Sequence, residues 1–218
     1  MALVYHGIND AVGKTVGGDF IYQDRDFEIF ADPTLPGRLG KIRQRLDPKF
    51  EQTVIDLQAT LAAFPVPLYA HVAQHRRRTK NPPPDSWVAF STSKRGYKRL
   101  PHLEIGLWED RLYIWLDVLE EATDRRDHLN QLPATQVLAL PATFKCADDH
   151  TDKLAERPLT AATYQDLMAV QATQRHAEWL VGRTFLRGTA FFETTPDQQR
   201  TMIQQTVAAL LPLYRQLI

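Results

Sequence analysis

Residues 102–108 (HLEIGLW) and 111–119 (RLYIWLDVL) decide the fold. Apolar side chains alternate with other types along both runs, which is the period of two that is typical of β-strands. Only Glu109 and Asp110 separate the runs, so we expect an antiparallel hairpin. A slip of one residue would exchange the two faces of the hairpin, so the pattern also predicts its register.

The predicted register gives the hairpin two different faces. One face is aliphatic and must pack on the core, with the cross-strand pairs Leu107–Leu112, Ile105–Ile114 and Leu103–Leu116. The other face mixes aromatic and ionisable groups: His102 opposite Asp117, Glu104 opposite Trp115, Gly106 opposite Tyr113, and Trp108 near the turn. Flat apolar walls with a few polar groups suit a ligand cleft. The alternative is a helix that covers the aromatic residues and leaves the polar ones at its rim.

Patterns on either side of the hairpin predict the remaining elements. Further strands are expected at residues 67–73, 86–91, 142–147 and 179–186. Helices are expected at residues 39–46, 47–64, 160–178 and 195–217. Asp47-Pro48 and Thr195-Pro196 both look like an N-cap followed by proline, and Thr160 looks like a third N-cap. Helices that come before and after an antiparallel sheet in the sequence predict an α+β fold in a single compact domain.

Composition narrows the class of protein. The chain has 218 residues, of which 44% are apolar and 24% charged, and its formal net charge is zero. These values are typical of a globular protein and exclude a disordered chain. No run of 18 apolar residues is present, which argues against a membrane span. We read residues 1–23 as a loose N-terminal extension and residues 24–218 as the domain.

Charge is uneven along the chain. Residues 71–99 contain Asp85 as their only carboxylate and eight cations: Arg76, Arg77, Arg78, Lys80, Lys94, Arg95, Lys98 and Arg99. Residues 109–127 carry seven carboxylates and three arginines. Such asymmetry is typical of an anion-binding face. It is equally consistent with a solvated loop that is neutralised by the acidic stretch.

Three functional hypotheses follow from this charge map. The first is a binding domain for a small anionic ligand, phosphorylated or nucleotide-like. The residues expected to bind the anion are Arg76, Arg77, Arg95 and Lys98. The expected apolar wall is Trp108, Tyr113 and Trp115, and the groups expected to give polar specificity are His102, Glu104 and Asp117. Trp87 and Tyr97 could also stack a planar group. The second is nucleic-acid binding through basic loops 76–80 and 94–99. The weakest is a hydrolase that uses His102 with Asp117 or Glu104, so whether the protein is an enzyme stays open.

Other chemistry has little support in the sequence. His71 and His75 have ligand spacing but lie in a strand pattern without the glutamate of an H-E-x-x-H motif, so no metal site is predicted. The sequence leaves any cofactor unknown. Cys146 is the only cysteine and is expected to be a buried thiol. A lone cysteine, and the lack of a signal-like apolar core in residues 1–20, lead us to expect a cytoplasmic protein. No feature of the sequence indicates the oligomeric state.

Several motifs carry a family resemblance. They are residues 71–78 (HVAQHRRR), 81–90 (NPPPDSWVAF), 94–102 (KRGYKRLPH) and 105–108 (IGLW). Over residues 26–218 the chain resembles the YktB-like family, bacterial proteins of unknown function of the UPF0637 type. The resemblance implies a compact α+β domain with a TBP-like curved sheet. It implies no activity and no catalytic residues.

Overall fold

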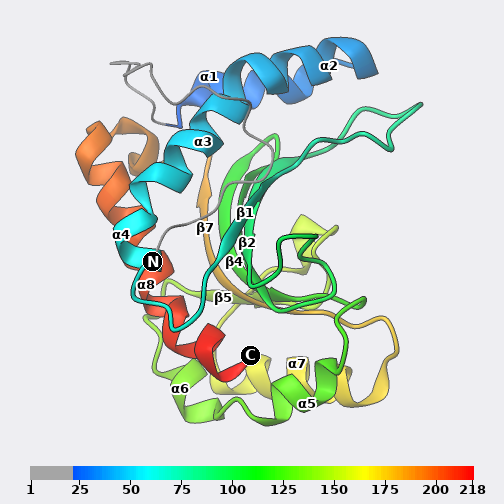
Figure 1. Ribbon diagram of the computed structural model, residues 1–218, viewed down its shortest axis with the longest axis vertical. Helices are drawn as coiled ribbons and strands as arrows, with labels where there is room; N and C mark the ends of the chain where they lie inside the picture. The colour runs from blue at the N-terminus through cyan, green and yellow to red at the C-terminus, as the bar shows by residue number, and fades with distance from the viewer. Residues whose placement is uncertain (1–21) are drawn as a thin grey trace.

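A seven-stranded antiparallel sheet in the order β1-β2-β3-β4-β7-β5-β6 organises the molecule (Figure 1). The structure, a computed structural model, describes residues 22–218. The strands are β1 Tyr69–Val72, β2 Ser86–Ser91, β3 His102–Leu107, β4 Arg111–Val118, β5 Lys145–Ala147, β6 Arg157–Pro158 and β7 Trp179–Leu186. The interpretation of the N-terminus as a loose extension falls almost entirely outside the described residues.

Helices cover one face and one end of this sheet (Figure 1). The helices are α1 Asp24–Phe27, α2 Leu35–Lys41, α3 Asp47–Asp56, α4 Gln58–Leu61, α5 Arg125–Asn130, α6 Ala134–Leu138, α7 Ala161–Thr173 and α8 Pro196–Gln216. A π-helical turn lies at Ile42–Leu46, and 3-10 turns lie at Glu28–Ala31, Lys153–Ala155 and Ala190–Glu193. Helices α3, α4 and α8 lie along the same side of the sheet (Figure 1). The predicted α+β class with an antiparallel sheet is confirmed.

The hairpin register is confirmed at every predicted pair of β3 and β4. Its aliphatic face is fully buried and belongs to the main core, where it packs with residues of α8 such as Val207 and Leu210. Burying one leucine side chain contributes about 2 kcal/mol to the free energy of unfolding. The six aliphatic side chains of this face therefore hold α8 on the sheet and leave the opposite face for other roles.

Two of the three expected helix caps are confirmed. The side chains of Thr160 and Thr195 accept hydrogen bonds from the backbone N–H groups of Thr163 and Gln198, at the starts of α7 and α8. The prediction of an N-cap at Asp47 is wrong, because Asp47 lies inside a continuous helical run from α2 to α3 and its side chain makes no capping hydrogen bond. The π-helical turn before Pro48 lets the helix pass a residue that has no N–H.

Two smaller expectations concern burial and membranes. Cys146 is a free, fully buried thiol on β5, as predicted, and burial raises its pKa. Within residues 22–218 no helix has the length and apolarity that crossing a bilayer requires.

Candidate functional site

The sheet face opposite α8 holds the aromatic residues that the sequence singles out. Tyr113 and Trp115 form a second, smaller apolar cluster with Ala147 and Leu180, and Trp87 and Trp108 pack against it. Tyr113 and Trp115 are only 3% and 6% exposed, so they form a buried floor. Among residues 22–218, the side chains that pack on this floor come from β2, the hairpin turn and the 3-10 turn of Ala155, and none comes from a helix of the kind that the alternative interpretation expected.

Two glycines allow these rings to lie flat on the sheet. A Cβ atom at Gly106 would collide with the hydroxyl end of Tyr113, and one at Gly182 would collide with the ring of Trp115. Each ring therefore occupies the space that a side chain at the facing glycine would fill. This position lets the Tyr113 hydroxyl donate a hydrogen bond to Glu104 Oε1 at 3.0 Å. The bond fixes one carboxylate oxygen of Glu104 and leaves the other free.

His102, Glu104 and Asp117 come together beside this floor, and we call them the His102–Glu104–Asp117 cluster. The His102 Nδ1–H donates to the backbone carbonyl oxygen of Leu100 at 2.9 Å, and the ring is 0% exposed. Its Nε2 lies 3.8 Å from both Glu104 Oε2 and Asp117 Oδ2. This distance is too long for a hydrogen bond, so His102 Nε2 is bonded to neither carboxylate. The ring of Tyr97 packs edge-on against His102.

Burial raises the pKa of two carboxyl groups on this face. Burial, and then the neighbouring Glu104 and Glu178, hold the pKa of Asp117 well above its ordinary value. Burial, followed by Glu104, raises the pKa of Asp85 to about 7. Like charges in a low-dielectric site cannot all be ionised at little cost. The face therefore favours bound protons or cations.

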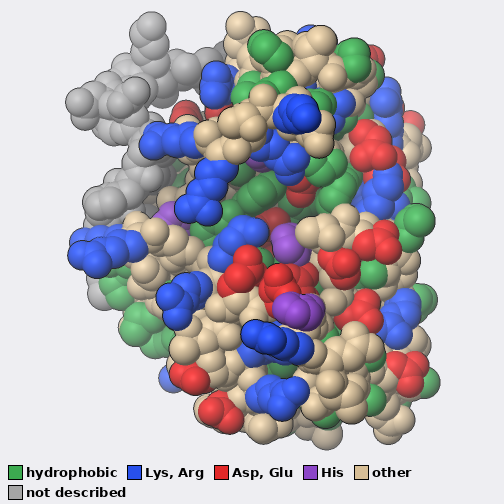
Figure 2. All heavy atoms as spheres, turned by 90° about the vertical axis from the view of Figure 1, so that its right-hand side faces the viewer, with side chains coloured by type: hydrophobic (Ala, Val, Ile, Leu, Met, Phe, Trp, Pro, Cys, Tyr) green, Lys and Arg blue, Asp and Glu red, His purple; other side chains and the backbone are tan. Residues whose placement is uncertain are grey.

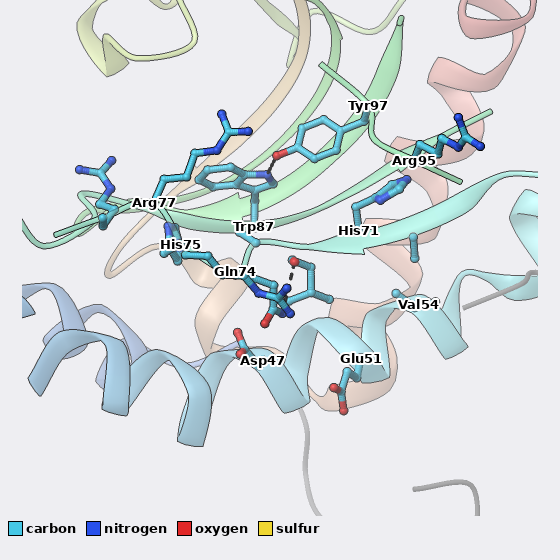
Figure 3. A pocket seen from close by; sticks show the side chains of 15 residues that line it. Asp47, Glu51, Val54, His71, Gln74, His75, Arg77, Trp87, Arg95 and Tyr97 are labelled. Carbon is cyan, nitrogen blue, oxygen red and sulfur yellow. Dashed lines mark hydrogen bonds between the residues drawn. The ribbon is translucent and has the colours of Figure 1, made fainter. Parts of the chain in front are cut away.

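A second feature, the arginine-lined cavity, lies at the edge strand β1, between α3 and the loops that flank β2 (Figure 3). Its volume is about 600 Å³. The side chains that define it are Arg76, Arg77 and Arg78 from the β1–β2 loop, Arg95 and Tyr97 from the β2–β3 loop, and Trp87 from β2. Trp87 Nε1 donates to the Tyr97 hydroxyl at 2.7 Å, with Arg77 to one side of this pair and Arg95 to the other (Figure 3). The two basic loops thus meet at one cavity, although they leave opposite ends of β2.

The basic residues divide into two groups by their partners. Within residues 22–218, Arg76, Arg77 and Arg95 make no ion pair. Lys98 instead lies 4.0 Å from Glu121, outside the cavity, and Arg99 lies 3.5 Å from the Thr123 hydroxyl. Neutralisation by the acidic stretch therefore applies to part of the basic segment only. Figure 2 shows Lys and Arg side chains around a central group of Asp, Glu and His side chains on this side of the molecule.

Other residues of the arginine-lined cavity were not in the predicted site. His71 lies on β1 and His75 follows that strand, while Asp47 and Glu51 lie on α3 (Figure 3). Burial, and then Arg78 and Arg43, lower the pKa of His75 to about 4, so its ring is neutral at pH 7. Burial, followed by Glu51, raises the pKa of Asp47 to about 6. The positive charge of the cavity at neutral pH therefore comes from its arginines.

Comparison with known proteins gives the family. A family model described as a domain of unknown function, DUF1054, matches residues 22–214. The chain belongs to the DUF1054 family. A UPF0637 protein of Levilactobacillus brevis is 61% identical over 198 residues, covering 91% of this chain and 99% of the relative. UPF0637 proteins of Lacticaseibacillus casei and Bacillus cytotoxicus are 41% and 36% identical, each covering 88% of this chain and 95% of the relative.

The DUF1054 assignment confirms the resemblance found in the sequence. The names of these relatives state no activity, so the family is consistent with an uncharacterised function. The geometry of the DUF1054 chain described above is therefore the basis for a functional proposal.

Proposed function

We propose that this protein binds a small anionic ligand, phosphorylated or nucleotide-like, in the arginine-lined cavity, and that it does so in the cytoplasm. One observation carries the proposal: arginines without an ion-pair partner within residues 22–218 converge on one cavity of about 600 Å³. Pockets for small molecules usually measure about 300–1,000 Å³. Unpaired arginines around such a volume are suited to an anion that supplies the missing partner.

Each wall of the cavity suits a different part of such a ligand. The guanidinium groups of Arg77 and Arg95 can bind phosphate oxygens in a bidentate manner. Trp87 and Tyr97 offer flat rings, and their mutual hydrogen bond fixes them for stacking on a planar group. Asp47 can accept a hydrogen bond from a sugar hydroxyl or an amino group. A ligand with a phosphate, a hydroxyl-bearing part and a planar part would use all three.

Isothermal titration calorimetry with ADP tests this proposal. Separate titrations with adenosine and with pyrophosphate test the planar and the anionic part of that ligand. We expect the double variant Arg77→Ala/Arg95→Ala to bind ADP and pyrophosphate at least tenfold more weakly, because each lost charged hydrogen bond costs about 1.5–3 kcal/mol of binding free energy. Arg126→Ala is the matched control, since Arg126 is exposed on α5 and outside the cavity. Unchanged affinity in the double variant, or no heat from either phosphate compound with the native protein, would refute the proposal.

Nucleic-acid binding through loops 76–80 and 94–99 is the second candidate. Arg76, Arg77 and Arg78 are exposed, and Lys and Arg side chains spread beyond the cavity on this side of the molecule (Figure 2). Fluorescence anisotropy with a single-stranded RNA oligonucleotide distinguishes it from the first candidate. Nucleic-acid binding predicts an affinity that falls steeply between about 50 and 200 mM salt. Absence of binding at the lower salt concentration excludes it.

The hydrolase hypothesis lacks a supporting observation. The buried His102 Nε2 has no hydrogen-bond partner, so no serine, threonine or cysteine hydroxyl or thiol of residues 22–218 is activated by it. We therefore do not propose a hydrolytic role for His102 with Asp117 or Glu104.

A further inference from the structure

The His102–Glu104–Asp117 cluster has the geometry of a metal site. His102 Nε2, Glu104 Oε2 and Asp117 Oδ2 all lie within 4.8 Å of one another, and two of the three separations are 3.8 Å. The point in their plane that is equidistant from three atoms so spaced lies no more than about 2.5 Å from each, close to the bond lengths of zinc and other divalent ions. The three atoms come from adjacent strands β3 and β4, whose register fixes their positions.

Two of the three residues have an outer partner that aims the free ligand atom. The Nδ1–H of His102 donates to the Leu100 carbonyl, which places the lone pair of the neutral ring on Nε2. The Tyr113 hydroxyl donates to Glu104 Oε1 and leaves Oε2 directed at the cluster. Metal-binding histidines and carboxylates almost always have such outer-shell hydrogen bonds. The Gly106–Tyr113 contact therefore serves to position Glu104.

Unsatisfied polar atoms provide an independent observation. His102 Nε2 and Asp117 Oδ1 have no hydrogen-bond partner, although the two side chains are 0% and 2% exposed. Leaving buried polar groups of this kind unpaired costs about 1–3 kcal/mol each, and more where the group is charged. A proton on His102 Nε2 would not remove this cost, because both carboxylates lie 3.8 Å away. A cation at the cluster would pair with His102 Nε2, and it would also satisfy Asp117 Oδ1 where that carboxylate binds through both of its oxygens.

We propose that His102, Glu104 and Asp117 bind one divalent transition-metal ion of the zinc or manganese type. One imidazole nitrogen and two carboxylate oxygens form a mixed donor set that such ions accept, whereas Mg²⁺ and Ca²⁺ prefer oxygen alone. Three protein ligands leave further coordination positions for water or for a ligand atom. The site uses none of the arginines and goes beyond the proposed function.

A neighbouring cluster, Asp149–His150–Glu178, is the main competitor for such an ion. Its polar atoms are already paired: the backbone N–H and the Nδ1 of His150 both lie 2.6 Å from Glu178 Oε2, and Asp149 Oδ1 accepts from the backbone and hydroxyl of Thr151. Asp149 is also exposed. The cluster therefore makes its own hydrogen bonds and serves as the matched control.

The test is metal binding by protein that has been stripped with EDTA and titrated with ZnCl₂ or MnCl₂ in a calorimeter at pH 7.5. The native protein should bind one equivalent of at least one of these ions, and elemental analysis after dialysis should find it. Asp117→Asn and Glu104→Gln keep the shape of each side chain and should weaken binding at least tenfold. Asp149→Asn, which changes the exposed member of the competing cluster, should bind within about threefold of the native protein.

Tyr113→Phe adds a readout that separates ligation from folding. Losing the outer-shell hydrogen bond should weaken metal binding by roughly tenfold while the circular dichroism spectrum is retained. The visible absorption of bound Co²⁺ should change in the same variant. The proposal is overturned if the native protein binds neither ion, if the Asp117 and Glu104 variants bind as well as the native protein, or if Asp149→Asn loses as much affinity as they do.

Discussion

Replacing Asp85 by Asn should stabilise the protein at pH 8 and change its stability little near pH 4. Asp85 precedes β2 and is only 8% exposed. Burial, and then repulsion by Glu104, raise its pKa from 3.8 to about 7, while His150 and Arg78 offset a part of the shift. Asparagine has the shape of the protonated carboxyl group and carries no charge to bury.

The sign and size follow from proton linkage. Between pH 3.8 and about 7 the folded protein keeps a proton on Asp85 that the unfolded chain has released, so this group lowers stability as pH rises through that window. Each unit of pKa shift corresponds to about 1.4 kcal/mol, so the full penalty is about 4 kcal/mol at pH 8 and about 2 kcal/mol at pH 5.5. Asp85→Asn has no carboxyl group to ionise, so its free energy of unfolding should not include this loss.

Urea denaturation of the native protein and Asp85→Asn at pH 5.5 and pH 8, with EDTA present, measures both differences. Asp166→Asn is the control, because Asp166 is an exposed carboxylate of α7. The variant should gain roughly 2 kcal/mol more over the native protein at pH 8 than at pH 5.5. A gain that does not depend on pH, or a loss of stability at pH 8, would refute the argument that a buried carboxylate of raised pKa lies at this position.

Three further predictions concern packing, capping and ligand binding. Gly106→Ala should lower the free energy of unfolding by about 2–3 kcal/mol in urea, because its methyl group would collide with Tyr113; an unchanged midpoint contradicts this. Thr195→Ala should lower it by about 1 kcal/mol in the same assay through loss of the α8 cap, whereas Thr201→Ala would not remove that cap. ADP should bind more tightly at pH 6 than at pH 8, because a bound anion raises the pKa of Asp47 further, so that Asp47 takes up a proton when ADP binds. Calorimetry that shows equal affinity at both pH values would exclude this coupling.

Much of the sheet could be predicted because its determinants are local. The alternation in β3 and β4 admits a single register once one face is aliphatic, and the two-residue connection leaves no room for a slip. The bounds of β2 and β7 agree with residues 86–91 and 179–186 for the same reason. The candidate residues His102, Glu104 and Asp117 come together as a direct result of this register.

The cavity could not be derived in the same way. The loops that carry Arg77 and Arg95 have no period, and their meeting depends on the packing of Tyr97 against Trp87 and His102. Trp87 pairs with Gly106 across β2 and β3, so it lies on the same face of the sheet as Tyr113 and Trp115. Extending the β3–β4 register to β2 would predict this position from the sequence. Asp47 was misassigned because the cap-plus-proline pattern does not reveal the π-helical turn that precedes it.

The rings that lie over Gly106 and Gly182 have a consequence for how this face can change. A larger residue at position 106 fits only if position 113 becomes smaller, and a smaller residue there removes the donor to Glu104. At Gly182 the obstacle differs, because a side chain there would first meet the backbone carbonyl of Ile114, and a smaller residue at position 115 would not remove that contact. Gly106 and Tyr113 therefore form one mutational unit, in which either single replacement passes through a less stable protein before the second can partly compensate.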